Sequence, residues 1–202
     1  MQVPFYFDYA CPWAYLGSCR AEAFFGELGA TIEFRPVHLA TLREPTAGPQ
    51  QAPTGERRGA WYMDDLQGWS EMIGGDLNLA PKELVGRSTR LALCGALVAA
   101  DAGKLREYHY PAYRARWVEA RDISDPDVVH ALLAGAGLDA DVALTRASSP
   151  ELEARLDQAT QEAIDRGVFG VPTCFVGDRM FWGNDRFELA RFYLERALEE
   201  AA

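Results

Sequence analysis

The stretch VPFYFDYACPW, residues 3–13, decides the fold because it joins an apolar strand to a helix through a cysteine. Residues 2–8 are apolar and aromatic and lead into a turn, which is typical of a short buried strand. Pro12 suits the first position of a helix, where no backbone N–H is needed and its fixed φ is already helical. We therefore expect Cys11 to cap the helix N-terminus, where the helix amides lower the pKa of a thiol and favour its reactive thiolate.

No second cysteine follows Cys11 at the spacing of a redox motif. A Cys-x-x-Cys pair would need a cysteine at position 14, and the sequence has Ala14 there. Cys11 can therefore hold or attack a partner sulfur, but it cannot close a local disulfide. The alternative is a buried structural thiol, because free cysteine is among the most buried residue types. The cap position and the preceding turn argue against such burial.

The composition limits the functions that the chain can have. Its 202 residues, 49% of them hydrophobic, suit one domain or one domain with a large insertion. The net charge of −10 disfavours nucleic acid and anionic membrane surfaces as partners. We see no signal peptide in residues 1–30 and no apolar stretch near the roughly 18 residues of a membrane-spanning helix. The four cysteines lack metal-binding spacing and a dense disulfide pattern, which favours a cytoplasmic protein.

The two ends of the chain carry the predicted strands. Residues 12–28 have apolar side chains at helical spacing and residues 31–37 form a second strand, so the N-terminal end predicts a parallel βαβ unit. At the C-terminal end, a strand at 171–176 starts with a proline, and a Gly-Asp turn joins it to a strand at 179–182. An amphipathic helix over residues 187–198 follows.

The segment between these ends has a helical pattern. Residues 44–59 are rich in Pro, Gly, Gln and Thr and are predicted to be a loop. Helices are expected at 61–74, 85–102, 105–120, 127–136, 138–147 and 149–166. Neither end has enough strands to stand alone, so we expect one four-stranded mixed sheet. The prediction is an α/β, thioredoxin-like domain (1–43 and 167–202) with an all-helical insertion domain (44–166).

Val171 and Pro172 are the first candidates to complete a site around Cys11. A residue before a cis proline can offer its backbone N–H and C=O to an extended thiol peptide, and cis proline is usually retained for a purpose. The alternative is an ordinary strand start, where proline is tolerated. The βαβ unit that carries Cys11, together with the hairpin after Pro172, favours the functional interpretation.

Asn184, Asp185 and Arg186 lie directly before the last helix. One interpretation is a site for an anion or an α-amino acid, built from helix-start amides and nearby charges. The other is a simple helix cap in which Asp185 pairs with Glu188. The residues alone do not separate the two interpretations.

Seven aromatic residues of the helical segment could line an apolar pocket for a planar substrate, although a helical core with aromatic residues at its rim is the commoner arrangement. These residues are Trp61, Tyr62, Trp69, Tyr108, Tyr110, Tyr113 and Trp117. The three histidines have no partners at metal-ligand spacing, so no metal site is expected. Hydrolase, phosphate-loop and dinucleotide signatures are also absent.

The chain resembles the 2-hydroxychromene-2-carboxylate isomerases and the related kappa-class glutathione transferases, of the Dsb-type branch of the thioredoxin superfamily. The resemblance covers nearly the whole chain and is carried by residues 7–16, 35–37, 117–125, 167–173 and 181–186. It implies glutathione, or another low-molecular-weight thiol, as the cofactor. Cys11 stands where the family usually has the serine that holds the glutathione sulfur.

The resemblance also implies a role for each part of the cofactor site. Val171 would bond the backbone of the glutathione cysteine, with Pro172 in cis, and Asn184 and Asp185 would bind the γ-glutamyl end. Cys11 is the predicted catalytic residue. The predicted cofactor-binding residues are Pro12, Trp13, Val171, Pro172, Asn184, Asp185 and Arg186.

The leading hypothesis is a glutathione-dependent isomerase, or a kappa-type transferase, that acts on a small aromatic carboxylate and forms a homodimer, as the family implies. In the isomerases the cofactor thiolate adds to the chromene, the ring opens, a bond rotates and the thiol leaves. One alternative is a Dsb-type monothiol disulfide oxidoreductase with Cys11 as the attacking nucleophile. Another is a non-enzymatic module that binds a thiol or an aromatic ligand.

Overall fold

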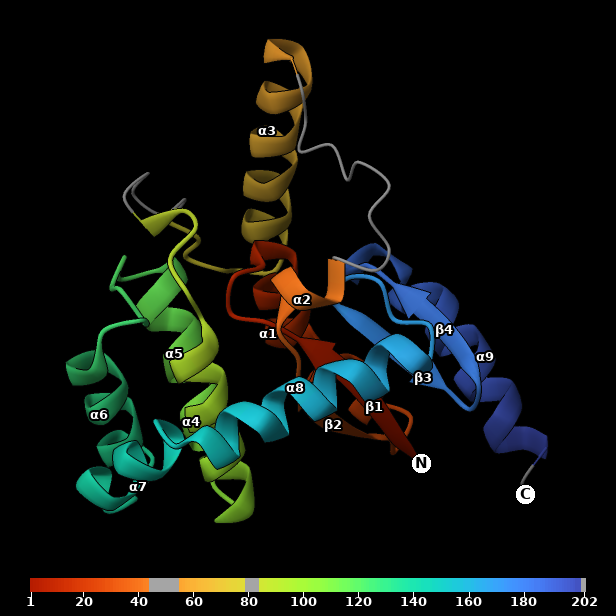
Figure 1. The fold of residues 1–202 in the computed structure, drawn as a ribbon. Coiled ribbons are helices and arrows are strands. Elements are labelled where there is room, and N and C mark those ends of the chain that lie inside the picture. Colours follow the sequence, from red (N-terminus) through yellow and green to blue (C-terminus); the bar gives the residue numbers. More distant parts are fainter. Residues whose placement is uncertain (44–54, 79–83, 201–202) are drawn as a thin grey trace.

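The structure is a computed structural model that describes residues 1–43, 55–78 and 84–200. Four strands form one mixed sheet with the order β2-β1-β3-β4 (Figure 1). β1 (Gln2–Phe7) runs parallel to β2 (Thr31–Pro36) and antiparallel to β3 (Thr173–Val176), which pairs antiparallel with β4 (Arg179–Trp182). The predicted thioredoxin-like α/β fold is confirmed.

Helices cover both faces of this sheet (Figure 1). α1 (Pro12–Gly26) and α9 (Phe187–Glu200) pack on one face, where the Phe5 ring centroid lies 6.2 Å from that of Phe187. α8 (Pro150–Asp165) crosses the opposite face. The guanidinium group of Arg166, directly after α8, lies 3.9 Å from the ring centroid of Phe175. A short 3-10 turn, η2 (Asn184–Arg186), precedes α9.

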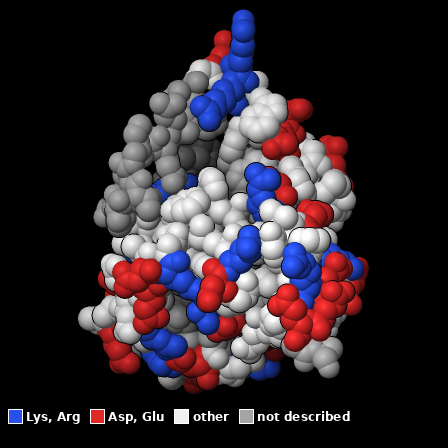
Figure 2. All heavy atoms as spheres, turned by 90° about the vertical axis from the view of Figure 1, so that its right-hand side faces the viewer, with Lys and Arg blue, Asp and Glu red and all other residues white. Residues whose placement is uncertain are grey.

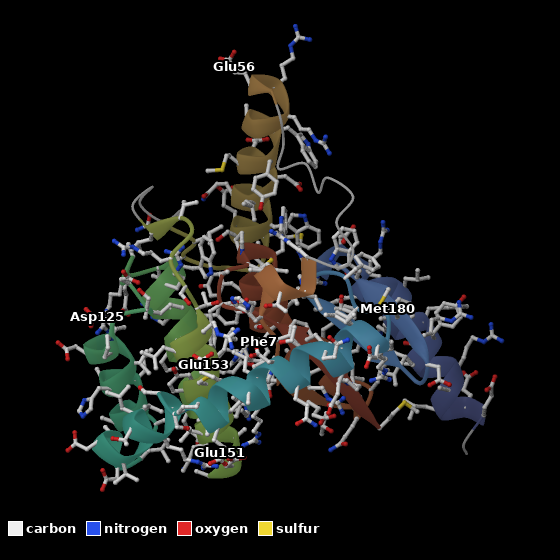
Figure 3. The ribbon with its side chains drawn as sticks, viewed as in Figure 1. Phe7, Glu56, Asp125, Glu151, Glu153 and Met180 are labelled. Carbon is white, nitrogen blue, oxygen red and sulfur yellow. The ribbon has the colours of Figure 1, made fainter. Side chains whose placement is uncertain are left out.

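The remaining helices lie to one side of the sheet and above it (Figure 1). They are α2 (Leu39–Arg43), α3 (Glu56–Met72), α4 (Arg90–Asp101), α5 (Leu105–Trp117), α6 (Pro126–Gly135) and α7 (Ala140–Ala147). Figure 3 places Phe7 in the centre of the molecule and Glu56 at the far tip of α3, which projects from the body. α8 contacts both β2 and α4, so the helical segment packs directly on the sheet. The division into a thioredoxin-like domain and a helical insertion domain stays a prediction.

Several predicted boundaries were wrong. The predicted loop at 44–59 includes the start of α3 at Glu56, while residues 44–54 lie outside the described part. The helix predicted from residue 85 begins only at Arg90, because Gly86 has a φ of +81° and breaks the helical path. The strand predicted from residue 171 pairs only from Thr173, since Pro172 has no N–H to donate to a neighbouring strand.

Two predicted helices start at capping side chains. The Asp125 carboxylate accepts from the Asp127 N–H at 2.9 Å at the start of α6. The Ser149 hydroxyl accepts from the Leu152 N–H at 3.3 Å at the start of α8. Within the described residues, every helix is too short or too polar to cross a membrane.

Candidate functional site at Cys11

Cys11 lies at the junction that the sequence indicates, between the end of β1 and the start of α1. It is the N-cap residue of α1, with extended backbone angles of φ −102° and ψ 115°. Its Sγ donates to the backbone carbonyl oxygen of Val171 at 3.2 Å. The Val171–Pro172 peptide bond is cis, as the resemblance implied. The structure therefore brings together two of the predicted site segments from opposite ends of the chain.

The Cys11 thiol is buried and protonated at neutral pH, contrary to both expectations from the sequence. Only 6% of the residue is exposed. Burial raises the pKa of the thiol to about 11, and the amides of Trp13 and Ala14 lower it too little to compensate. The Sγ accepts no capping hydrogen bond from a helix N–H, and it donates its own proton to the Val171 carbonyl oxygen. Cys11 is thus a neutral hydrogen-bond donor rather than a thiolate.

A buried carboxylate fixes the loop before Cys11. Asp8 is 1% exposed, and its side chain accepts three hydrogen bonds, from the N–H of Ala10 at 2.9 Å, the N–H of Leu39 at 2.7 Å and the Thr89 hydroxyl at 2.7 Å. We call these four residues the Asp8 cluster. Burial raises the pKa of Asp8, while the three donors oppose that rise. One side chain thus ties the loop to the starts of α2 and α4.

Two aromatic side chains of α5 hold the backbone of the same loop. The Tyr113 hydroxyl donates to the Asp8 carbonyl oxygen at 3.1 Å, and the Trp117 indole N–H donates to the Tyr9 carbonyl oxygen at 2.9 Å. Both side chains are buried, as is Tyr108. These three members of the aromatic set therefore belong to the helical core, which is the commoner arrangement that the sequence favoured.

Groups from three helices lie near Cys11. The Trp13 ring meets the Tyr62 ring of α3 edge-on, with centroids 5.8 Å apart. Arg43, at the end of α2, lies close enough to favour the charged forms of both Cys11 and Tyr62, although burial raises the pKa values of both. A cation and two partly exposed aromatic rings therefore lie on the side of the site where α1, α2 and α3 meet. Arg43 was not among the residues predicted from the sequence.

Pro172 and Asn184 both pack against α1 at Gly17. A Cβ atom on Gly17 of α1 would lie 3.3 Å from Cγ of Pro172 and 3.5 Å from Cβ of Asn184. The Gly183 N–H donates to the Pro172 carbonyl oxygen at 2.9 Å. Asn184 is 2% exposed, and its side-chain oxygen accepts from Arg20 at 3.4 Å. The turn at residues 183–186, which we call the Asn184 turn, is therefore held against α1 beside Pro172.

Asp185 and Arg186 lie on the outside of the Asn184 turn. Both are exposed, and the Asp185 carboxylate lies 3.8 Å from Nε of Arg186. The predicted cap pair with Glu188 is wrong, because η2 has no side-chain cap and Glu188 pairs with Arg20 at 2.8 Å. On the face seen in Figure 2, acidic and basic side chains are mixed across the lower half, below a mostly uncharged area. Asp185 thus presents a carboxylate to solvent, while the ligand roles of the turn stay predictions.

All four cysteines of the chain are free. Cys174, two residues after Pro172, lies opposite Phe5 in the sheet and is buried. Burial raises its pKa to about 12, so it does not serve as a resolving thiol for Cys11. The site contains one thiol, as the missing cysteine at Ala14 indicated.

Comparison with known proteins agrees with this geometry. Residues 2–195 match the family model of the DSBA-like thioredoxin domain. A 2-hydroxychromene-2-carboxylate isomerase from Pseudomonas putida is 32% identical, over 98% of this chain and 94% of the relative. The solved structure of a 2-hydroxychromene-2-carboxylate isomerase superposes with a TM-score of 0.88 at 26% identity, covering 100% of this chain and 98% of that one.

A more distant neighbour shares the fold alone. The cytosolic disulfide reductase DsbM from Pseudomonas aeruginosa, solved with GSH, has a TM-score of 0.68 at 20% identity, over 98% of this chain and 100% of that chain. A shared fold alone does not require sequence similarity. The Pseudomonas putida enzyme is nevertheless similar in sequence along nearly its whole length, and the domain model matches nearly the whole of this chain. The chain belongs to the 2-hydroxychromene-2-carboxylate isomerase family, within the DSBA-like thioredoxin-domain proteins.

Proposed function

We propose that this protein is a thiol-dependent isomerase of 2-hydroxychromene-2-carboxylate or a closely similar aromatic acid, with glutathione as cofactor. The observation that carries the proposal is the neutral Cys11 thiol, which points at the Val171 carbonyl oxygen from 3.2 Å. A protonated donor at this position can turn from Val171 to the sulfur of an incoming thiol. It would then stabilise that sulfur as a thiolate by a charge-assisted hydrogen bond.

The residues present fit a thiol of this kind. The sulfur end has the Cys11 S–H donor and the backbone of Val171, and the Asn184 turn offers the exposed Asp185 carboxylate to an α-ammonium group. Asn184, which is buried and bonded to Arg20, supports the turn rather than facing solvent. When bound, the thiol supplies the nucleophile that adds reversibly to the substrate. The protein's task is to hold that nucleophile and to orient the acid.

The groups around Trp13 support an aromatic acid as the substrate. The partly exposed rings of Trp13 and Tyr62 suit a planar aromatic body. Arg43 adds a positive charge beside Cys11, where the carboxylate of the substrate would be stabilised. A homodimer in the cytoplasm is part of the proposal and is supported by the family resemblance and the cysteine usage alone.

A redox role for Cys11 has less support. With a pKa of about 11, only about one Cys11 thiol in ten thousand is ionised at pH 7, and the thiolate is the attacking species. Cys174, two residues after Pro172, is buried in the sheet and is therefore not placed to resolve a mixed disulfide at Cys11. The chemistry of holding a thiol therefore fits this site better than disulfide exchange.

The test compares Cys11→Ser with Cys11→Ala in turnover of 2-hydroxychromene-2-carboxylate, followed by absorbance with and without glutathione. We expect turnover to require glutathione. Cys11→Ser keeps the donor and should retain most activity, whereas Cys11→Ala should lower kcat about 100-fold, as for loss of an oxyanion donor. Equal activity in the absence of any thiol, or full activity of Cys11→Ala, would contradict the proposal. A stable Cys11 adduct with oxidised glutathione in intact mass spectra would favour the oxidoreductase alternative.

A further inference from the structure

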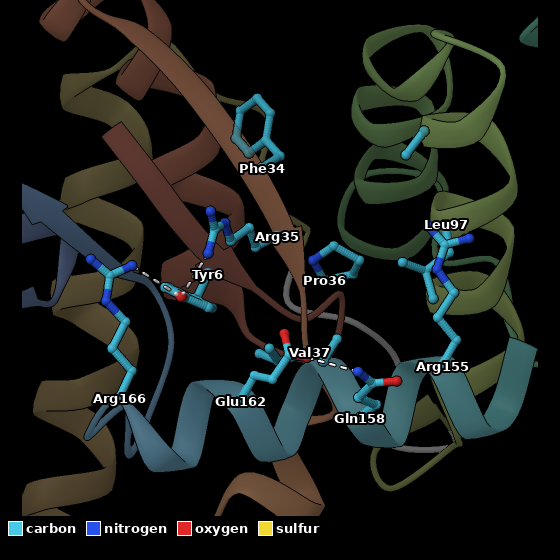
Figure 4. A pocket seen from close by; sticks show the side chains of 12 residues that line it. Tyr6, Phe34, Arg35, Pro36, Val37, Leu97, Arg155, Gln158, Glu162 and Arg166 are labelled. Carbon is cyan, nitrogen blue, oxygen red and sulfur yellow. Dashed lines mark hydrogen bonds between the residues drawn. The ribbon is translucent and has the colours of Figure 1, made fainter. Parts of the chain in front are cut away.

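A cavity of about 710 Å³ lies at the free edge of β2, between the sheet and the helices α4 and α8 (Figure 4). Its volume falls in the range of small-molecule sites, roughly 300 to 1,000 Å³. None of the residues predicted for the thiol site lines it. This edge cavity is therefore separate from the site at Cys11.

One end of the edge cavity carries two converging arginines. Arg35 and Arg166 both donate to the Tyr6 hydroxyl oxygen, at 3.3 Å and 3.4 Å, and Figure 4 shows their guanidinium groups on either side of it. Two positive charges that share one neutral oxygen can both be stabilised by a single anion bound between them. Guanidinium groups favour carboxylates and related anions. We call these three residues the head-group cluster.

Only one of the two arginines of the head-group cluster has a carboxylate partner among the described residues. Arg35 pairs with Glu33 at 2.8 Å. Arg166 forms no ion pair with any residue in the described ranges, and it is held instead by the Gly177 carbonyl oxygen at 3.2 Å and by the Phe175 ring. The one other carboxylate on the wall, Glu162, accepts from Gln158 rather than from an arginine. Arg166, which is fixed by packing and has no counter-ion in the part of the chain that the structure describes, is thus available to a ligand.

The wall beyond the head-group cluster is apolar. Phe34, Pro36, Val37, Leu97 and Ala159 line it. Arg155 also lines this wall, but both of its terminal nitrogens donate to the Asp101 carboxylate, at 2.7 and 2.8 Å, so it already has a carboxylate partner. A ligand that satisfies both parts of the cavity therefore has one anionic head and an apolar body.

We propose that the edge cavity binds an amphipathic organic monoanion, with its acidic head on the head-group cluster and its apolar body between β2 and α8. The proposal does not depend on the isomerase function, because no residue is shared between the two sites. It predicts a second small-molecule site on a chain whose net charge of −10 would otherwise repel anions.

The test titrates decanoate into the protein by calorimetry, with decan-1-ol as an uncharged probe of the same apolar chain. We expect saturable binding of decanoate and at least tenfold weaker binding of decan-1-ol, since a hydrogen bond to a charged group commonly contributes about a factor of ten. Saturating glutathione should leave decanoate binding unchanged. Absence of saturable decanoate binding, equal affinity for both probes, or competition by glutathione would each overturn the proposal.

Three variants locate the binding. Arg166→Gln should weaken decanoate binding about tenfold, and Ala159→Phe, which fills the apolar wall without a change in charge, should abolish it. Arg179→Gln is the matched control, because Arg179 also stacks on an aromatic ring, 4.0 Å from the Tyr193 centroid, but lies at the opposite edge of the sheet. If the folded variants Arg166→Gln and Ala159→Phe both bind within twofold of the unsubstituted protein, the edge cavity is not the site.

Discussion

The two ends of the candidate thiol site are built in opposite ways. At the sulfur end, the Asp8 cluster has all its hydrogen bonds inside the protein and Asp8 is almost fully buried. At the other end, the Asn184 turn presents Asp185 to solvent, and its side-chain support is the pair of 3.4 Å bonds from Arg20, beside the 2.9 Å backbone bond from Gly183 to Pro172. The difference indicates that folding fixes the position of Cys11, whereas the far end of the proposed thiol site offers an exposed charge.

Removing the Asp8 carboxylate should have the largest effect. Asp8→Ala leaves the Leu39 N–H and the Thr89 hydroxyl buried without an acceptor, so we expect a loss of about 3 kcal/mol in the free energy of unfolding. Urea denaturation followed by circular dichroism measures this loss. Asp178→Ala, in the exposed turn between β3 and β4, is the control and should change stability by less than about 0.5 kcal/mol. A loss below about 1 kcal/mol for Asp8→Ala would show that the cluster does not anchor the loop.

The pH dependence of stability should reveal the burial of Cys11. Because the pKa of its thiol rises from 9.0 to about 11 on folding, the folded state holds the proton more tightly than the unfolded state. The resulting stability is fully present below pH 9 and is lost as the pH rises through 11. The difference in unfolding free energy between the unsubstituted protein and Cys11→Ser should therefore shrink by about 2 to 3 kcal/mol between these values. A difference that does not vary with pH would mean that the thiol is not shielded from water.

Changes in the Asn184 turn should leave stability nearly unaltered and act on the cofactor. Asp185→Asn removes an exposed charge, so the unfolding free energy should change by less than about 0.5 kcal/mol. The KM for glutathione should rise about tenfold with little change in kcat, because a charge-assisted contact to the ammonium group is lost. Asp178→Asn is the matched control, with no expected change in KM. An unchanged KM for Asp185→Asn would remove the turn from the cofactor site.

Local patterns predicted the sheet and most of the helix starts, because they depend on neighbouring residues. Pro12 marked the start of α1, and Ser149 marked that of α8, where both the side chain and the following proline favour a cap. The late start of α4 was missed, since Gly86 in a left-handed conformation is not distinguishable by sequence from a helical glycine. The fold therefore followed from short-range signals, with errors at segment ends.

The chemistry of Cys11 could not be predicted in the same way. Its burial and its hydrogen bond depend on Val171, 160 residues away, and the desolvation there outweighs the local effect of the helix amides. The role of Asp8 was missed for a similar reason, because Leu39 and Thr89 lie 31 and 81 residues further along the chain. A carboxylate directly after a buried strand was the one signal in the sequence that could have identified it.

Gly17 has a consequence for which thiols the protein accepts. It is a helix residue without a side chain, and it lets Pro172 and Asn184 lie directly against the backbone of α1. The spacing between the sulfur end and the Asn184 turn is therefore set by the bare helix. We expect this spacing to select cofactors by length, so that a thiol shorter or longer than a tripeptide would lose one of the two contacts. Gly17 would then determine specificity although it touches no part of the cofactor.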